Sequence, residues 1–221
     1  MKNKIIVFDY NGFVCPHNLA DETTTIHWRE ILGVSKDELS DEELRKNIDR
    51  AYSTGCVLSN LETHRNEDDA KHLGTILLTL SGECSADDVT NLYKSLTGYY
   101  RSMEMDKVLI NKIYELADNN RVYLIANVNQ YSEIALYSNI DCSMFDDVFT
   151  SLKLHRRTTD LEFFFKVQSA IKAPLKDILL VTADPRHYEV ACDFGWNAVL
   201  SSGDSYKLMD ALLRNGGNCN E

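Results

Sequence analysis

Five short runs of β-branched and aromatic residues, separated by longer segments with helical periodicity, constrain the fold of this chain more than any other feature. The runs are KIIVF (4–8), VYLIA (122–126), VFTS (148–151), DILLVT (177–182) and NAVLS (197–201). Helical patterns lie between and after them, at 108–119, 131–139, 161–172, 189–195 and 205–215. A continuous apolar run is typical of a strand that is buried on both faces of a parallel sheet. The alternation therefore predicts a doubly wound, Rossmann-like α/β sheet.

The alternation breaks between the first run and the second. Residues 16–105 are almost wholly helical in pattern, and SADD at 85–88 predicts a helix start, with a serine N-cap and acidic residues in the first turn. We therefore predict a Rossmann-like core formed by residues 1–15 and 106–221. An all-helical cap domain, residues 16–105, is inserted after the first strand of this core.

Polar residues follow four of the five predicted strands. Ligands of open α/β sheets bind outside the carboxyl ends of the strands, and the ends of parallel strands meet at one edge of the sheet. The polar segments there are 9–12, 126–129, 153–157 and 182–187. The sequence thus predicts one site at this edge, built from four loops.

The residues at these strand ends resemble the motifs of the haloacid dehalogenase (HAD) superfamily. In that family the first strand is followed by Asp-x-Asp-Gly-Thr, and FDYNGF at 8–13 matches its first Asp and its Gly. LIANVN at 124–129 is similar to the second motif, and ILLVTADPRHYEVACDFGW at 178–196 is similar to the fourth in length and apolar frame. The resemblance spans nearly the whole chain. It implies a Rossmann-like core with a helical cap inserted after the first motif.

The chain departs from the phosphatases of this family at each group that handles phosphate or metal. Asn11 stands in place of the second Asp, Ala126 in place of a hydroxyl residue, Thr158 at the register of the third-motif Lys, and Ala183 in place of an acidic magnesium ligand. An amide cannot exchange a proton near neutral pH, and an alanine offers no oxygen to a cation that prefers near-ideal octahedral geometry. We therefore expect no cofactor, with magnesium bound only weakly.

The dehalogenases of the same family are a nearer match at these positions. They keep the first Asp as a nucleophile on carbon and use no metal, and their fourth motif has small polar residues, an Asn, and a water-activating acid three residues later. Thr182, Ala183, Asp184 and His187 fall at those places. This resemblance implies that Asp9 is the nucleophile and that His187 is the base that activates water for hydrolysis of the ester. The residues expected to bind substrate are Asn11, Asn127, Arg157 and Asp184.

Two other functions remain open from the sequence. A catalytically degenerate member of the superfamily, acting as a binding or regulatory module, would also lack the phosphate-handling groups. A weak magnesium-dependent phosphatase is the third alternative. Asn11 is expected to stabilise its own turn through local hydrogen bonds, and Asn129 is expected to cap the helix that follows it.

Charge and cysteine content restrict the partners. The formal net charge of −11 argues against nucleic acid and anionic membranes, because both require basic patches. The six cysteines have no CxxC spacing and are expected to be reduced thiols; one of them, Cys15, lies just beyond the first motif and is a candidate reactive residue. No apolar run reaches about 18 residues, and no signal peptide is recognised at the start of the sequence. These features predict a cytoplasmic protein with a small-molecule substrate or ligand.

Overall fold

The computed structural model describes residues 4–11, 13–14, 28–53, 62–65, 68–102, 105–201 and 209. Gly12, Cys15 and most of the helix expected at 205–215 lie outside these residues, as do the side chains of 49–53. The chain divides into two compact units. The first comprises Met1–His17, Glu104–Asn127 and Tyr137–Glu221, and the second comprises Asn18–Met103 and Val128–Leu136.

The first unit contains a five-stranded parallel sheet of order β3-β2-β1-β4-β5. The strands are β1 (Ile5–Asp9), β2 (Arg121–Ala126), β3 (Asp147–Thr150), β4 (Ile178–Thr182) and β5 (Asn197–Leu200). They match the five predicted runs. All residues of β1 and β4 are buried, as continuous apolar runs in a parallel sheet require.

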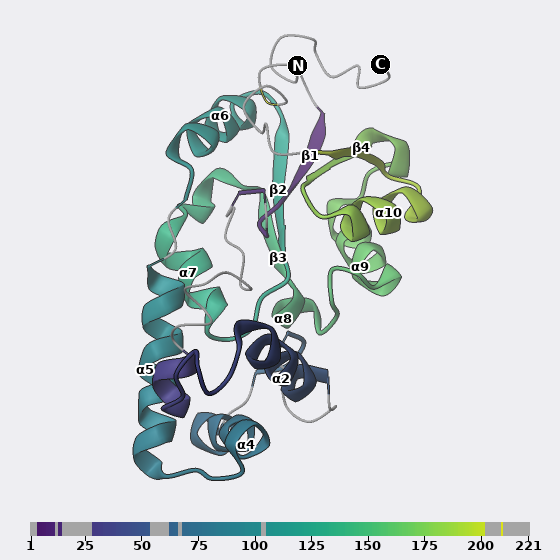
Figure 1. Ribbon diagram of the computed structural model, residues 1–221. Helices are drawn as coiled ribbons and strands as arrows, with labels where there is room; N and C mark the ends of the chain where they lie inside the picture. The colour runs from purple at the N-terminus through teal and green to yellow at the C-terminus, as the bar shows by residue number, and fades with distance from the viewer. Residues whose placement is uncertain are drawn as a thin grey trace. The chain divides into compact units, whose positions relative to one another are not determined.

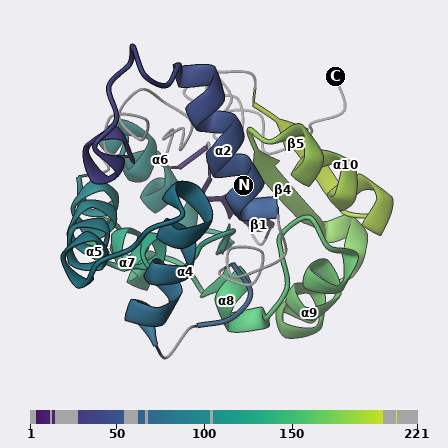
Figure 2. The ribbon, with the colours of Figure 1, turned by 60° about the horizontal axis from the view of Figure 1, so that its bottom comes forward.

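Helices cover both faces of this sheet. The helix α6 (Lys107–Ala117) lies on one side, and α9 (Leu161–Ile171) and α10 (Pro185–Phe194) lie on the other (Figure 1). Figure 2 shows the same separation, with α10 beside β5. The first unit also contains the one-turn helix α8 (Ser151–Leu154) and the 3₁₀ turns η1 (Cys142–Met144) and η2 (Leu175–Asp177). The helix α7 (Ser132–Asn139) begins in the second unit and ends in the first. The predicted α/β class is confirmed.

The core on the α9 and α10 side fixes which way the strand ends face. Side chains alternate between the two faces of a strand. Ile5 and Val7 of β1, with Ile178 and Leu180 of β4, pack in one apolar cluster with residues of α9 and α10. Continuing this alternation by two residues on each strand places Asp9 and Thr182 on the same face. Two polar side chains therefore end adjacent strands and face the side of the sheet that α10 covers.

The described part of the second unit is helical, as predicted for the insertion. Residues 28–32 are helical, and α2 (Asp41–Ser53), α4 (Asp69–Ser81) and α5 (Ala86–Arg101) follow. Ser85 caps α5 in a reciprocal capping box with Asp88, which confirms the prediction made from SADD. The core of this unit includes Trp28, Leu73 and Leu92, all buried. No strand occurs among its described residues.

The segment Val128–Leu136, which follows β2, packs with this helical unit. The Asn129 side chain accepts hydrogen bonds from the backbone N–H groups of Tyr131 (3.0 Å) and Ser132 (2.8 Å), so Asn129 does cap the next helix. Glu133 is buried and pairs with Arg65. In the described part of the chain, no helix is long and apolar enough to cross a membrane.

Candidate active site

The carboxylate of Asp9 and the imidazole of His187 form a buried pair. Asp9 is the last residue of β1, and its side chain is wholly buried (0% exposed). Pro185 starts α10, so His187 lies in the first turn of that helix and not in a preceding loop. His187 Nδ1 lies 2.6 Å from Asp9 Oδ2. The structure thus brings together the two residues that are predicted from the sequence to be catalytic.

Thr182 contributes a second hydrogen bond to the same carboxylate oxygen. The Thr182 hydroxyl donates to Asp9 Oδ2 over 2.6 Å, and its oxygen accepts from the backbone N–H of Asp184 over 3.0 Å. Because the Asp184 N–H donates to the Thr182 hydroxyl oxygen, the hydroxyl proton points toward Asp9. Asp9 Oδ1 accepts from the backbone N–H of Asn11 over 3.1 Å.

Thr158 completes the network on the far side of the imidazole ring. It precedes α9 and is wholly buried, and its Oγ1 lies 2.8 Å from His187 Nε2. Both ring nitrogens of His187 therefore have polar partners, as a buried imidazole requires. The ring orientation is fixed from two sides.

The surroundings of His187 act on its pKa in opposite directions. Burial lowers the pKa, but the charge of Asp9 and its hydrogen bond raise it, with a further contribution from Asp184, whose Oδ2 lies 3.9 Å from Nε2. The neighbouring Arg186 lowers it slightly. The net result is a pKa above the ordinary value of 6.5. The pair is therefore a carboxylate facing an imidazole that favours its protonated form.

This shift predicts a pH-dependent part of the stability. A proton held more tightly by the folded state stabilises it fully below the unfolded-state pKa of about 6.5, and this contribution disappears as the pH rises through the higher folded-state pKa. We expect the difference in the free energy of unfolding between wild type and His187→Gln to shrink as the pH rises through that window. Urea unfolding at a series of pH values measures it, with the exposed His64→Gln as control. A difference that grew with pH would contradict the assignment.

Asn11 and Asn127 join the ends of β1 and β2. The Asn11 side-chain oxygen accepts from the backbone N–H of Asn127 over 2.8 Å. The Asn11 side chain, expected to stabilise its own turn through local hydrogen bonds, therefore makes a bond between the ends of two strands. The Asn127 side-chain oxygen is buried and has no hydrogen-bond partner in the described part of the chain. Their assignment to substrate binding stays a prediction.

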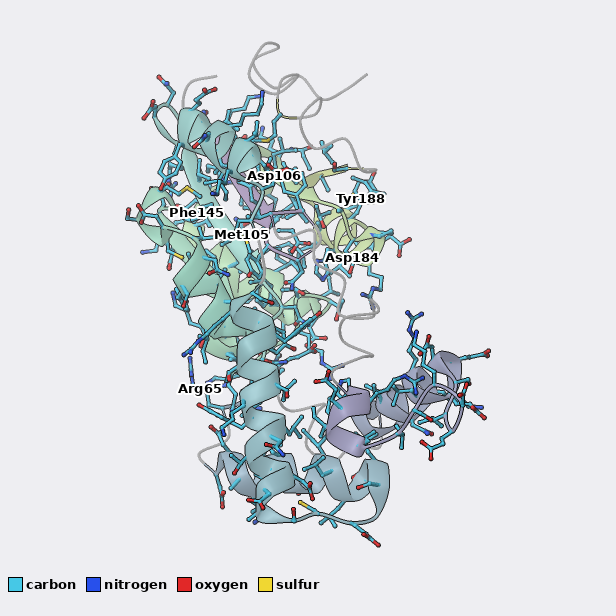
Figure 3. All side chains as sticks on the ribbon, turned by 60° about the vertical axis from the view of Figure 1, so that its left-hand side comes forward. Arg65, Met105, Asp106, Phe145, Asp184 and Tyr188 are labelled. Atoms are coloured by element: carbon cyan, nitrogen blue, oxygen red, sulfur yellow. The ribbon has the colours of Figure 1, made fainter. Side chains whose placement is uncertain are left out.

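Asp184 and Arg157 each form hydrogen bonds with a residue two or three positions further along the chain. Asp184 caps the N-terminus of α10 (Figure 3): its side chain accepts from the backbone N–H of Arg186 over 2.8 Å and pairs with the Arg186 guanidinium. Burial raises the pKa of Asp184, but the bonds from Arg186 outweigh it, and the net pKa is lowered. The backbone N–H of Arg157 donates to Asp160 over 3.0 Å. A role of either side chain in binding substrate remains a prediction.

The donor set around Asp9 does not fit magnesium. A hard cation needs several oxygen ligands in octahedral geometry. Here the Asp9 carboxylate already accepts three protein hydrogen bonds, the imidazole of His187 lies against it, and Ala183 supplies no side-chain oxygen. Across the described residues, no group of three or more His, Cys, Asp or Glu side chains is placed to hold a metal ion.

Two hydroxyl residues at the site were not assigned a role from the sequence. Thr182 ends a predicted strand beside Asp9, so the alternation along adjacent strands could have indicated it. Thr158 carried no such signal, because its contact with His187 joins a loop to a helix 29 residues away. The three cysteines that the structure describes, Cys84, Cys142 and Cys192, are free thiols.

Comparison with known proteins identifies the fold. No protein-family model matches the sequence. A HAD-like family hydrolase from Porphyromonas gingivalis has 18% sequence identity and a TM-score of 0.71, with 97% of this chain and 99% of that chain covered. A HAD family enzyme from Bacteroides thetaiotaomicron, solved with magnesium and inorganic phosphate, has 14% identity and a TM-score of 0.70, with 94% and 98% covered.

A 2-haloacid dehalogenase from Pseudomonas syringae pv. Tomato DC3000 is also similar. It has 15% identity and a TM-score of 0.63, with 90% of this chain and 86% of that chain covered. At such identities the likeness shows the fold, and the fold is that of the HAD-like hydrolases. The expected Rossmann-like core with an inserted helical domain is confirmed.

Proposed function

We propose that this protein is a HAD superfamily hydrolase that works without a metal ion and uses Asp9 as its nucleophile on a small-molecule carbon or acyl centre. The observation that carries the proposal is the contact of 2.6 Å between Asp9 and His187 at the carboxyl end of the sheet. A carboxylate nucleophile needs a partner that offsets its charge and later assists hydrolysis of the ester. His187 is placed to act in both steps.

The chemistry follows from these two residues. Asp9 attacks the electrophilic carbon, a Cγ–O–C ester forms, and the leaving group departs with the bonding electrons. Water then hydrolyses this ester at Asp9 Cγ, the product leaves as an alcohol, and the carboxylate is restored. At an acyl centre the intermediate is a mixed anhydride instead, and the product leaves as a carboxylic acid. The buried, hydrogen-bonded setting supports such a step, because fixed donors need no reorganisation during the reaction.

A substrate panel with and without metal tests this proposal. The panel contains 2-chloropropionate, styrene oxide, p-nitrophenyl acetate and p-nitrophenyl phosphate. We expect turnover of at least one of the first three, unchanged by magnesium or a chelator, since the donor set does not fit the ion. One turnover in ¹⁸O-water, with enzyme in excess, should then place label on the peptide that contains Asp9. Magnesium-dependent turnover of the phosphate ester alone would overturn the proposal and favour the weak phosphatase.

One observation favours a second candidate, a degenerate member that binds a ligand without turning it over. Asp9 is 0% exposed, and both of its carboxylate oxygens already accept hydrogen bonds from the protein. A nucleophile must reach its substrate, so this site would have to open before attack. Absence of turnover with every panel member, together with absence of label on Asp9, would support the binding module.

A further inference from the structure

We propose that Thr182 and His187 form an oxyanion hole around Oδ2 of Asp9, and that Oδ1 is the atom that attacks the substrate. This inference rests on the proposed function, in which Asp9 becomes an ester. It gives His187 a different role from the general base expected from the sequence: the imidazole donates a hydrogen bond to a developing charge.

The two oxygens of Asp9 have unequal partners. Oδ2 accepts two short hydrogen bonds, from Thr182 Oγ1 and His187 Nδ1, both at 2.6 Å. Oδ1 accepts one longer bond, from the backbone N–H of Asn11 at 3.1 Å. Hydrogen bonds withdraw electron density from the oxygen that accepts them, so Oδ1 is the better nucleophile. Attack through Oδ1 leaves Oδ2 as the carbonyl oxygen of the ester.

The bonds behind the two donors hold them in the donating orientation. The backbone N–H of Asp184 donates to Thr182 Oγ1 over 3.0 Å, which leaves the Thr182 proton for Asp9. Thr158 Oγ1 lies 2.8 Å from His187 Nε2 and fixes the ring with Nδ1 toward Oδ2. We therefore treat Thr158 as a positioning residue. The hole exists before any charge develops, as electrostatic catalysis requires.

The steps balance with water as the only co-reactant. In the first step the Oδ1–carbon bond forms and the carbon–leaving-group bond breaks, with its electron pair going to the leaving group. Water then adds to Cγ, and the negative charge that develops on Oδ2 is held by Thr182 and His187. The Cγ–Oδ1 bond breaks next. One proton of the water ends on the alcohol product, the other passes to the solvent, and Asp9 is again a carboxylate.

Thr182→Val tests the donor with little change of shape. Loss of one oxyanion-hole donor costs about 10²–10³-fold in rate. We expect Thr182→Val to slow hydrolysis of the Asp9 ester by about that factor, measured by single-turnover kinetics with the fastest panel substrate, and Thr182→Ser to restore most of the rate. Thr90→Val, at an exposed helical threonine, is the matched control. An unchanged rate of ester hydrolysis in a folded Thr182→Val variant would contradict the proposed oxyanion hole.

Counting labelled oxygens tests the attacking atom in the wild-type protein, independently of any variant. If Thr182 and His187 keep Oδ2 in place, each turnover replaces only Oδ1 of Asp9 with an oxygen from water. After many turnovers in ¹⁸O-water, the Asp9 carboxylate should therefore carry one labelled oxygen. Two labelled oxygens would show that either oxygen attacks and would overturn the assignment. Absence of label on Asp9 would instead contradict the proposed function itself, so the two failures are distinguishable. Where Thr182→Val does not fold, this count decides alone.

The pH profile of ester hydrolysis separates a donor from a base. A general base must be unprotonated, so its step would slow at acidic pH, whereas a donor keeps its proton there. The charged groups that face the His187 ring are Asp9 from β1 and Asp184 and Arg186 from the start of α10. We expect no loss of the hydrolysis rate as His187 becomes protonated. A loss that vanishes in His187→Gln would restore the general-base role and overturn the inference.

Discussion

Asp9→Asn should abolish turnover of every panel substrate while leaving the protein folded. The amide has the same shape as the carboxylate and can still accept the Thr182 hydrogen bond, but it cannot form the ester. Loss of a catalytic nucleophile costs roughly 10⁴–10⁶-fold in rate. The measurement is steady-state turnover beside circular dichroism, which should match the wild-type spectrum.

The matched control for this substitution is Asp193→Asn. Asp193 is an exposed aspartate of α10, the helix that also carries His187. We expect this variant to keep the wild-type rate, because its side chain does not belong to the hydrogen-bond network at Asp9. Measurable turnover by Asp9→Asn, in a preparation shown by mass spectrometry to be free of deamidated protein, would remove Asp9 from the role of nucleophile.

His187→Ala should let the ester accumulate on Asp9. The imidazole offsets the charge of the carboxylate during attack, but the bond to substrate is formed by Asp9 alone. Hydrolysis of the ester depends more strongly on the ring, which acts there as a donor or as a base. Either role is worth roughly 10²–10⁴-fold. Mass spectrometry of the peptide that contains Asp9 should therefore show a stable substrate adduct, which is absent from wild type at the same time point.

The control for trapping is the double variant Asp9→Asn with His187→Ala. It keeps the cavity left by the missing imidazole but has no nucleophile, so no adduct should form. Adduct formation elsewhere on the chain would point to chemical modification by the probe. Rapid turnover by His187→Ala with no adduct would mean that His187 does not assist hydrolysis. The hydrogen bonds between His187 and Asp9 would then have only a structural role.

Much of the fold could be predicted from the sequence, because continuous apolar runs and helical periodicity are local signals. The order of the strands in the sheet could not be predicted from these local signals. The approach of Asp9 to His187 could be predicted as well, since the carboxyl ends of parallel strands meet at one edge of a sheet. The helical pattern at 189–195 covers only the later part of α10, because the polar segment 185–188 has no apolar periodicity. The N-cap Asp184 and the first residue Pro185 are the signals that mark the true start.

The rest of the site depends on tertiary packing that no local pattern encodes. Thr158 contacts His187 only because the loop before α9 and the first turn of α10 lie on the same face of the sheet. Asn11 could be placed in its turn from the sequence, but its bond to Asn127 requires β1 and β2 to be neighbours. The boundaries predicted for the two domains also left residues 128–136 with the core, whereas this segment packs with the helical unit.

The early start of α10 has an electrostatic consequence for the carboxylate beside it. The aligned peptide dipoles of a helix place roughly half a positive elementary charge at its N-terminus. His187 is the third residue of α10, so the field at this end of the helix acts on the ring and on the Asp9 oxygen that the ring contacts. A substitution at Pro185 or Asp184 that shifted the helix start would therefore change the field and the ring position together. The residues around the fourth motif therefore act on Asp9 through the backbone of α10 as well as through their side chains.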